Sequence, residues 1–360
     1  MANTDRVEAR YYRRTEGAFV CELCQQKCFI RPGEFGYCGT RRADDDMLVS
    51  SSYGKISSLS VDPIERMNLY HYKPHSKCLS VGSVGCNMNC QYCRNYPFAK
   101  LTIGKKRATY KSPEELLEMC RGEDMDIVCF AYNEPMVWFE YIMDFARIAP
   151  DMHIVLMTNG LVNDGPLKEL CGVVDAVCVD IKAFDTATHR RLCEAEMGDI
   201  VTAARNIFYR GIHMELSYLV VPGVNDSEAE IGRFCGWVRE ISEDIPVHFS
   251  RFRPDYMMRD APITPLEELL RCREIGRETG LNYVYVGNTP VDDAGDTVCP
   301  DCGETAVRRL GYSSNPSGLA GDACARCGRP LNMIRRMRTA ASRGPSLSGT
   351  LSSAARGRVS

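Results

Sequence analysis

The 360-residue sequence has no apolar run approaching the roughly 18 residues that a membrane-spanning helix needs. Its N-terminus, MANTDRVEARYYRR, also lacks the apolar core of a secretory signal peptide. Charge of one sign is not in excess either, because 44 basic and 47 acidic side chains leave a formal net charge of −3. This balance offers no broad basic surface of the kind that nucleic-acid binding usually requires. We therefore expect a cytoplasmic protein with no membrane contact and no strong nucleic-acid signal.

Cysteine, in contrast, is abundant, with 19 residues in the chain. In a cytoplasmic protein, so many cysteines argue against a disulfide framework and favour metal binding. Eleven of them fall into three closely spaced sets. The other eight are scattered, mostly within apolar runs, and we interpret them as small buried hydrophobic residues: Cys78, Cys120, Cys129, Cys171, Cys178, Cys193, Cys235 and Cys272.

The central set, Cys86, Cys90 and Cys93, has Cys-x3-Cys-x2-Cys spacing and follows a short apolar run that ends in glycine. Iron–sulfur cubanes held wholly by protein take four thiolates, and structural zinc also takes four ligands, so three cysteines make an incomplete site. A loop this short can bind three irons of one cluster and leave the fourth open to a substrate or cofactor. The alternative is a closed structural site completed by Cys78 or His75, which would have to reach back along the preceding strand.

Short apolar strands alternate with amphipathic helices over the central part of the chain. Such alternation predicts parallel βα units, and six or seven units favour a partial barrel over the eight of a closed one. Ser112, followed by Pro113 and Glu115, predicts a capped helix start. The predicted strands are 79–84, 127–131, 153–157, 176–181, 212–220, 246–252 and 283–287, and further helices are predicted at 136–149, 165–171, 198–210, 227–241 and 265–279.

The length leaves room for one large domain and small modules. We divide the chain into an N-terminal cysteine-rich segment over 1–75, a central α/β domain over 76–290 and a cysteine module over 291–334. The remaining residues, 335–360, are basic, rich in Ser, Gly and Ala and free of acidic side chains, which predicts a disordered tail.

Polar residues follow several predicted strands, at the end where an α/β barrel builds its site. Asn133 and Glu134 come after the second strand, on a proline-ended turn whose acceptors would suit an α-amino group. Thr158-Asn159-Gly160 follows the third strand, and Asp180 and Lys182 end the fourth. A solvated helix-capping pair is the alternative for each of these pairs. His213 and Glu215, on the fifth strand, would either line the barrel mouth or form a buried hydrogen-bonded pair.

Two further cysteine sets flank the central domain. The C-terminal set consists of two Cys-x2-Cys knuckles, each followed by glycine, which is the pattern of a four-thiolate zinc ribbon. The N-terminal set also offers four thiolates, which would hold zinc or an auxiliary iron–sulfur cluster; zinc is favoured because the set is complete in itself. The sets are Cys299, Cys302, Cys324 and Cys327, and Cys21, Cys24, Cys28 and Cys38.

Together these motifs resemble one family within the pyruvate formate-lyase activating-enzyme-like radical S-adenosylmethionine (SAM) proteins, the radical SAM component of the AmmeMemoRadiSam system. The resemblance covers about residues 20–334. It implies an α/β fold with a partial (βα)6-type radical SAM barrel, an N-terminal cysteine-rich segment and a C-terminal zinc ribbon. The motifs that carry it are the N-terminal cysteine set, Val61-Asp-Pro-Ile-Glu65, Gly85-Cys-Asn87, Tyr132-Asn-Glu-Pro135, Tyr285-Val-Gly-Asn288 and the ribbon cysteines.

The resemblance also implies the chemistry. The central cysteines would hold a [4Fe–4S] cluster whose open iron binds SAM, and a low-potential ferredoxin or flavodoxin would supply the electron. Lys182 is expected at the cofactor's carboxylate, Asp180 at its amino group or at the substrate, and Tyr92 near the adenine, unless its side chain belongs to the core. Glu134 matches the glycine-glycine-glutamate-proline element that holds the amino group, whereas Tyr132 and Asn133 depart from it.

The substrate stays open at this point. Glycyl-radical installation in a partner protein, modification of a small molecule and modification of RNA are all compatible with the sequence. Two functions of other classes are also compatible with the cysteine sets, namely a metal-stabilised scaffold and a simple electron carrier.

Overall fold

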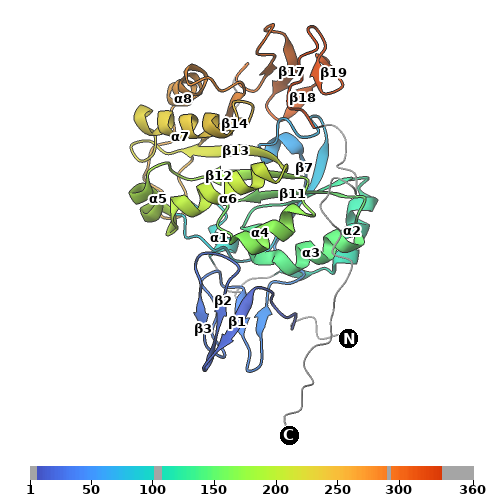
Figure 1. Cartoon of the computed structure of the whole chain (residues 1–360), viewed down its shortest axis with the longest axis vertical. Helices are drawn as coiled ribbons and strands as arrows, with labels where there is room; N and C mark the ends of the chain where they lie inside the picture. The colour runs from blue at the N-terminus through green and yellow to red at the C-terminus, as the bar shows by residue number, and fades with distance from the viewer. Residues whose placement is uncertain (1–5, 101–107, 290–292, 335–360) are drawn as a thin grey trace.

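The computed structural model describes residues 6–100, 108–289 and 293–334. At its centre lies an eight-stranded sheet whose first and last strands occupy opposite edges, so the sheet is open (Figure 1). Seven strands are parallel, which confirms the predicted α/β fold with a parallel core. The order is β15 (Val284–Gly287), β14 (Val247–Arg251), β13 (His213–Val220), β12 (Ala176–Ile181), β11 (His153–Thr158), β10 (Ile127–Phe130), β8 (Lys77–Gly82) and the antiparallel β7 (Ser58–Pro63).

The helices between these strands pack on one face of the sheet. All seven predicted strands are present, and the helix predicted from Ser112 has its full capping box, with Glu115 N donating to Ser112 Oγ at 3.2 Å. A helix that the sequence did not predict, α5, follows Asp185, whose side chain caps it. The helices are α1 (Tyr96–Ala99), α2 (Pro113–Gly122), α3 (Phe139–Ile148), α4 (Asp164–Cys171), α5 (Thr186–Cys193), α6 (Met197–Tyr209), α7 (Glu228–Ile241) and α8 (Leu266–Glu278).

The two faces of the sheet carry different cores. On β13, Leu216 and Tyr218 belong to the large apolar core under the helices. The opposite face holds a smaller core that includes Cys129 and Cys178, and the segment 64–72 fills it with Ile64, Met67, Leu69 and Tyr72. This segment continues from β7 and closes the interior at the end where the parallel strands begin.

Two small modules lie at opposite ends of the molecule (Figure 1). The N-terminal one contains a three-stranded sheet and a two-stranded sheet, and the C-terminal one holds three- and two-stranded sheets. Their strands are β1 (Tyr12–Thr15), β2 (Ala18–Cys21), β3 (Phe29–Ile30), β4 (Arg41–Ala43) and β5 (Leu48–Ser50), and then β16 (Thr297–Val298), β17 (Thr305–Leu310), β18 (Ser313–Asn315), β19 (Leu319–Ala320) and β20 (Ala323–Cys324). The predicted domain limits stay predictions, and the predicted tail lies outside the described residues.

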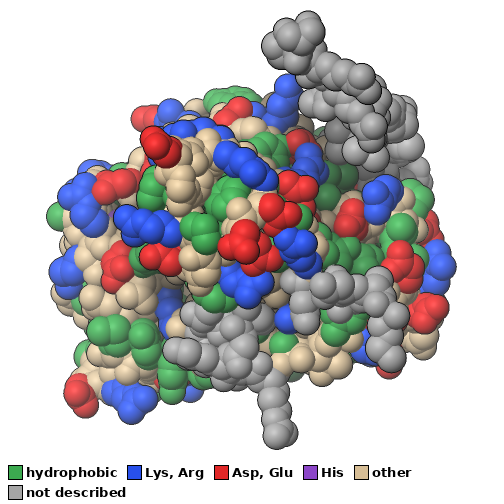
Figure 2. Space-filling model, turned by 90° about the horizontal axis from the view of Figure 1, so that it is seen from below, with side chains coloured by type: hydrophobic (Ala, Val, Ile, Leu, Met, Phe, Trp, Pro, Cys, Tyr) green, Lys and Arg blue, Asp and Glu red, His purple; other side chains and the backbone are tan. Residues whose placement is uncertain are grey.

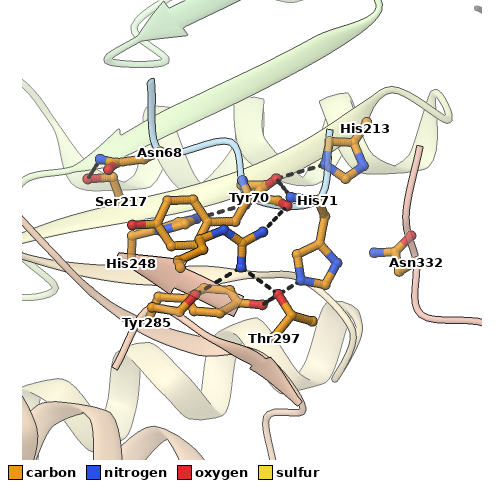
Figure 3. A network of polar contacts seen from close by, with 12 residues as sticks. Asn68, Tyr70, His71, His213, Ser217, His248, Tyr285, Thr297 and Asn332 are labelled. Atoms are coloured by element: carbon orange, nitrogen blue, oxygen red, sulfur yellow. Dashed lines mark hydrogen bonds and ion pairs between the residues drawn. The ribbon is translucent and has the colours of Figure 1, made fainter. Parts of the chain in front are cut away.

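A buried polar network joins the C-terminal module to the sheet (Figure 3). Glu215 accepts four hydrogen bonds, from the backbone N–H groups of Tyr70 (3.0 Å) and His71 (2.7 Å) and from Nε2 of His213 (3.0 Å) and His248 (2.7 Å). Burial alone would raise the pKa of Glu215, but the two histidines hold it below its usual value. His213 and Glu215 are therefore a buried hydrogen-bonded pair, the second of the two alternatives that the sequence left open.

No helix among the described residues is long and apolar enough to cross a membrane. On the face shown in Figure 2, lysine and arginine side chains are interspersed with aspartate and glutamate instead of gathering into a patch of one sign.

Candidate functional site

The loop with the three central cysteines starts just beyond β8, at the carboxyl end of the parallel strands. Gly85 precedes Cys86 with φ of +87°, and a Cβ there would lie 2.3 Å from the carbonyl oxygen of Cys38, so glycine is required by both conformation and space. The two residues considered for closing the site, Cys78 and His75, lie at the other end of β8, which separates them from Cys86. The structure thus offers neither of them to this loop.

Asn133, at the end of β10, fixes the start of the cluster loop. Its Oδ1 accepts a hydrogen bond from Ser83 N at 2.9 Å, and its Nδ2 donates to the carbonyl of Gly85 at 2.8 Å. Both ends of the amide are therefore engaged with the segment that leads into Cys86, at Ser83 and at Gly85. Its predicted contact with a cofactor stays a prediction.

Glu134 lies under the neighbouring turn and is buried. Its carboxylate accepts hydrogen bonds from Thr158 Oγ1 (2.7 Å) and from the backbone N–H groups of Asn159 (2.7 Å) and Met136 (3.0 Å). Burial raises the pKa of Glu134 to about 7, although these donors act in the opposite direction. Because a carboxylate has about four acceptor positions, one remains for a further donor such as an amino group.

Asn159 links Glu134 to the cysteine loop. Its Nδ2 donates to Asn87 Oδ1 at 2.9 Å and lies 3.8 Å from Cys86 Sγ, while its Oδ1 accepts from Leu161 N. The ends of β10 and β11 are thus tied to the cysteine loop through Glu134 and Asn159. The sequence singled out the turn around Asn159 but not its contact with the thiol.

The surroundings of Cys90 favour a thiolate. A hydrogen bond with the Cys193 thiol lowers the pKa of Cys90 to about 6, and Lys182 and Lys100 act in the same direction against burial. At Cys86, burial raises the pKa to about 12, and Lys100 partly opposes this. Cys193, which the sequence placed among the buried hydrophobic cysteines, is thus a neighbour of the loop. No local signal in the sequence could have shown this.

Asp180 and Lys182 end β12 beside this loop. Lys182 Nζ lies 2.9 Å from Asp180 Oδ2, and Asp180 and Cys90 hold the pKa of Lys182 above its usual value despite burial. The Lys182 cation also acts electrostatically on Glu134. Asp180 and Lys182 therefore lie at the Cys90 side of the loop, and Glu134 lies at its Cys86 side.

Tyr92 and Tyr132 flank the predicted site, one through a buried side chain and the other through an unusual backbone conformation. The Tyr92 side chain is buried in the core, with its hydroxyl 3.9 Å from Cys193 Sγ and its ring edge-on to Phe252. Tyr132 has φ of +70°, a conformation that glycine adopts freely and tyrosine does not, and its hydroxyl donates to Asp62 at 3.0 Å. Tyr132 replaces a glycine of the family's motif, yet its backbone keeps a conformation typical of glycine.

The donor set around the central thiols fits an anionic cluster. Amide and thiol donors reach Cys86 and Cys90, and two cations lie nearby. Among the described residues, the three thiols do not form a group with all sulfurs within 4.8 Å, whereas the ribbon cysteines do. Thiolates that each bind a separate iron of one cluster stand further apart than those sharing a single ion.

The ribbon cysteines converge on one point. Cys299 Sγ lies 3.5 Å from Cys327 Sγ, and Cys302 Sγ lies 3.6 Å from Cys324 Sγ. A tetrahedral Zn²⁺ with Zn–S bonds of about 2.3 Å would place its sulfurs about 3.8 Å apart. The geometry is therefore consistent with the predicted zinc-ribbon module.

Comparisons with known proteins agree with this arrangement. The Radical SAM superfamily model matches residues 80–235. The uncharacterized protein MJ0808 of Methanocaldococcus jannaschii is 32% identical over 333 residues, which cover 91% of this chain and 99% of that protein. The pyruvate formate-lyase 1-activating enzyme of Escherichia coli (strain K12) is 25% identical over 175 residues, 46% of this chain and 71% of the enzyme.

A solved radical SAM methyltransferase from Sphaerobacter thermophilus aligns with 60% of this chain and 68% of its own, at 18% identity and a TM-score of 0.48. The superfamily match spans the cysteine loop and the strand ends that converge on it. It implies an iron–sulfur cluster and SAM as cofactors and a reductant as a requirement, whereas the relation to the activating enzymes is distant. The chain belongs to the radical SAM superfamily.

Proposed function

We propose that this protein is an enzyme that reductively cleaves SAM at a [4Fe–4S] cluster held by Cys86, Cys90 and Cys93. The single observation that carries the proposal is the open loop at the carboxyl ends of the strands, to which Glu134 and Lys182 are brought from β10 and β12. When bound, the cluster would pass one electron to the sulfonium of SAM, giving methionine and a 5′-deoxyadenosyl radical that takes a hydrogen atom from the substrate.

The chain's own residues bind and orient in this scheme. Lys182, with one of its three donors on Asp180, would hold the carboxylate of SAM, and Glu134 would accept from its amino group. Asp180 is placed to meet the amino group or the substrate. Asn133 and Asn159 hold the loop itself, and the backbone of Tyr92 would lie near the adenine.

Cys193 does not supply the missing fourth ligand in this proposal. Its thiol is close enough to Cys90 to lower the pKa of that residue. A ligand to another iron of the same cluster would stand apart from Cys90 instead of in contact with it. We therefore assign Cys193 a contact with a ligand thiolate and leave the fourth iron to SAM.

The finer family assignment is the radical SAM component of the AmmeMemoRadiSam system, which rests on the joint motif pattern from the N-terminal cysteine set to the ribbon. A low-potential ferredoxin or flavodoxin would be the electron donor, and the protein would act in the cytoplasm. The ribbon cysteines would hold structural zinc.

A protein substrate is the second candidate within this function. It is supported by the similarity to pyruvate formate-lyase activating enzymes and to the benzylsuccinate synthase activating enzyme of Thauera aromatica. Each of these names describes the activation of another enzyme. Formation of a stable glycyl radical in a partner protein, detected by electron paramagnetic resonance (EPR), would distinguish this candidate from modification of a small molecule or of RNA.

The test is EPR of the full-length protein after anaerobic reconstitution and reduction. The signal of the central cluster should shift when SAM is added, and Cys86→Ala, Cys90→Ala and Cys93→Ala should each abolish the SAM-induced shift. Cys235→Ala, which replaces a buried cysteine on α7, is the matched control and should retain the shift. Lys182→Met should keep the signal but weaken SAM binding at least tenfold, because a lost charge-assisted contact costs about 1.5–3 kcal/mol. A signal that SAM leaves unchanged in the parent protein would contradict the proposal and favour an electron carrier or scaffold.

A further inference from the structure

The four N-terminal thiols surround a cavity beside the central loop. They come from the end of β2 and the two turns that follow, and together they line one small cavity. Its walls combine the sulfurs with apolar side chains and one buried guanidinium. The lining residues that matter here are Cys21, Cys24, Cys28, Cys38, Arg41 and Asn87.

The spacing of these thiols differs from that of a zinc site in the same chain. The ribbon cysteines lie mutually within 4.8 Å, close to the sulfur–sulfur distance of about 3.8 Å that tetrahedral zinc imposes. Within the part of the chain that the structure describes, the N-terminal four form no such group, and neither do the central three. The N-terminal set therefore shares its open spacing with the set assigned to a multi-iron cluster.

A buried donor at this cavity lacks a partner. Arg41 is only 1% exposed, its guanidinium pairs with Glu140 at 2.9 Å, and its Nε has no hydrogen-bond partner among the described residues. An orphaned buried N–H is costly unless something accepts from it. Because Arg41 lines the cavity, the inorganic sulfide of a cluster would be an acceptor for this donor. A zinc ion would add no acceptor beyond the cysteine sulfurs themselves.

Further donors already reach the sulfurs. Tyr37 N donates to Cys28 Sγ at 3.3 Å, and Thr40 Oγ1 lies 3.2 Å from Cys38 Sγ. Hydrogen bonds to cluster sulfurs are one of the means by which proteins set cluster potentials.

The N-terminal site and the central loop share a wall. Gln26, between Cys24 and Cys28, donates through Nε2 to the carbonyl of Asn87 at 3.0 Å, and Asn87 also lines the cavity. On the other side, the Cys38 carbonyl lies against Gly85 so closely that no side chain fits there. The residues on either side of Cys86 therefore contact the N-terminal cysteine turns at two points.

We propose that Cys21, Cys24, Cys28 and Cys38 bind a second iron–sulfur cluster, fully ligated by protein, through which electrons reach the central site. The site itself stands on the geometry above, whereas its role as a relay rests on the proposed function. One electron from a low-potential ferredoxin or flavodoxin would enter at this site and leave to the central one, with no bond made or broken. With four thiolates the site has no open iron for SAM.

The first test counts metal in the full-length Cys86→Ala/Cys90→Ala/Cys93→Ala variant after anaerobic reconstitution. It should retain two or four iron atoms with equal sulfide and give an EPR signal on reduction, because four cysteines hold either cluster type. Adding Cys24→Ser should remove both. In the unmutated protein, total iron should be about six to eight atoms per chain instead of about four. Iron near four in the unmutated protein, with a second zinc and no signal in the triple variant, would overturn the proposal.

Two more measurements test the Arg41 contact and the electron-relay role separately. Arg41→Gln should shift the EPR line shape and midpoint potential of the N-terminal cluster, and an unchanged spectrum would refute the assigned contact. Cys24→Ser in the otherwise native chain should slow 5′-deoxyadenosine release more with flavodoxin than with dithionite as reductant. Equal slowing would refute the relay. Iron at this site without any SAM cleavage would instead refute the proposed function and leave the site standing.

Discussion

Arg309 is the side chain whose loss should most clearly detach the C-terminal module. It lies on β17 and is 4% exposed. Its Nη1 donates to Gly295 O at 2.9 Å and to Thr297 Oγ1 at 2.7 Å, and its Nη2 donates to Tyr70 O at 2.6 Å. The guanidinium carbon also lies 4.3 Å from the centre of the Tyr70 ring. The contacts with Tyr70 reach from the C-terminal module to the segment 64–72, whereas those with Gly295 and Thr297 lie within the module.

The magnitude follows from these contacts. Only the hydrogen bond to Tyr70 and the contact with its ring leave the module; a hydrogen bond from a charged group contributes about 1.5–3 kcal/mol, and a desolvated cation–π contact contributes about 2 kcal/mol. Arg309→Met loses both, and it also removes the cost of burying the cation. We therefore expect about 4 kcal/mol less free energy of opening for the docked module. By the same arithmetic, its amide exchange should accelerate roughly a thousandfold.

Hydrogen exchange followed by mass spectrometry on the full-length, zinc-loaded protein is the assay. Arg309→Met should accelerate exchange in 293–334 and also in 68–73, because Tyr70 and His71 bind the module. Arg308→Met, an exposed neighbour on the same strand, is the matched control and should change stability by less than about 0.5 kcal/mol. The reasoning fails if Arg309→Met behaves like Arg308→Met, or if faster exchange stops at the module and spares 68–73.

Three further predictions concern the loop and the base of the sheet. Gly85→Ala should reduce iron at both the central and the N-terminal sites, because the new Cβ would meet the Cys38 carbonyl at 2.3 Å; iron analysis after reconstitution measures this. Asn133→Ala should leave the fold intact by circular dichroism but speed the loss of central iron to a chelator, since it removes both hydrogen bonds that hold the loop start. His71→Gln should flatten the pH dependence of the free energy of unfolding, measured by urea denaturation. Burial lowers the pKa of folded His71 to about 3, so below pH 6.5 the unfolded chain binds a proton at this residue that the folded chain does not. The parent protein should therefore lose about 1.4 kcal/mol of stability per pH unit below pH 6.5, or about 2 kcal/mol between pH 6.5 and 5.

Each of these has a result that would count against it. Gly85→Ala with full iron at both sites would show that the two loops do not press on one another. Equal chelation rates for Asn133→Ala and the parent would remove Asn133 from the support of the loop. A parent protein with the same pH slope as His71→Gln would mean that His71 accepts a proton in the folded state.

Much of the sheet could be predicted because its strands are continuous apolar runs bounded by caps and turns. β7 could not, since its pattern is inverted: Leu59 and Val61 are exposed, at 42% and 40%, while Asp62 is buried and bound to Ser80 and Tyr132. Helix α5 was missed for a related reason, because most of its residues are polar and one capping aspartate carries its start.

Some features of the site could likewise be predicted from the sequence, and others could not. Ligand spacing and strand-end residues are local signals, so the cysteine sets and Glu134 and Lys182 could be identified from the sequence. The contacts of Cys193 with Cys90 and of Cys38 with Gly85 join residues far apart in the chain, and no periodicity encodes them. The sequence placed Asn133 near the loop but did not show that its amide holds the two residues Ser83 and Gly85 ahead of Cys86.

The central claim is that the Cys86 loop supports reductive cleavage of SAM, and the most direct measurement is the formation of 5′-deoxyadenosine. Reconstituted full-length protein, supplied with SAM and a low-potential reductant under anaerobic conditions, should release 5′-deoxyadenosine and methionine in equal amounts. Cys86→Ala, Cys90→Ala and Cys93→Ala should each abolish release, while Cys235→Ala should not. Absence of 5′-deoxyadenosine from a preparation with a full, reducible central cluster, or undiminished release from any of the three loop variants, would contradict the account.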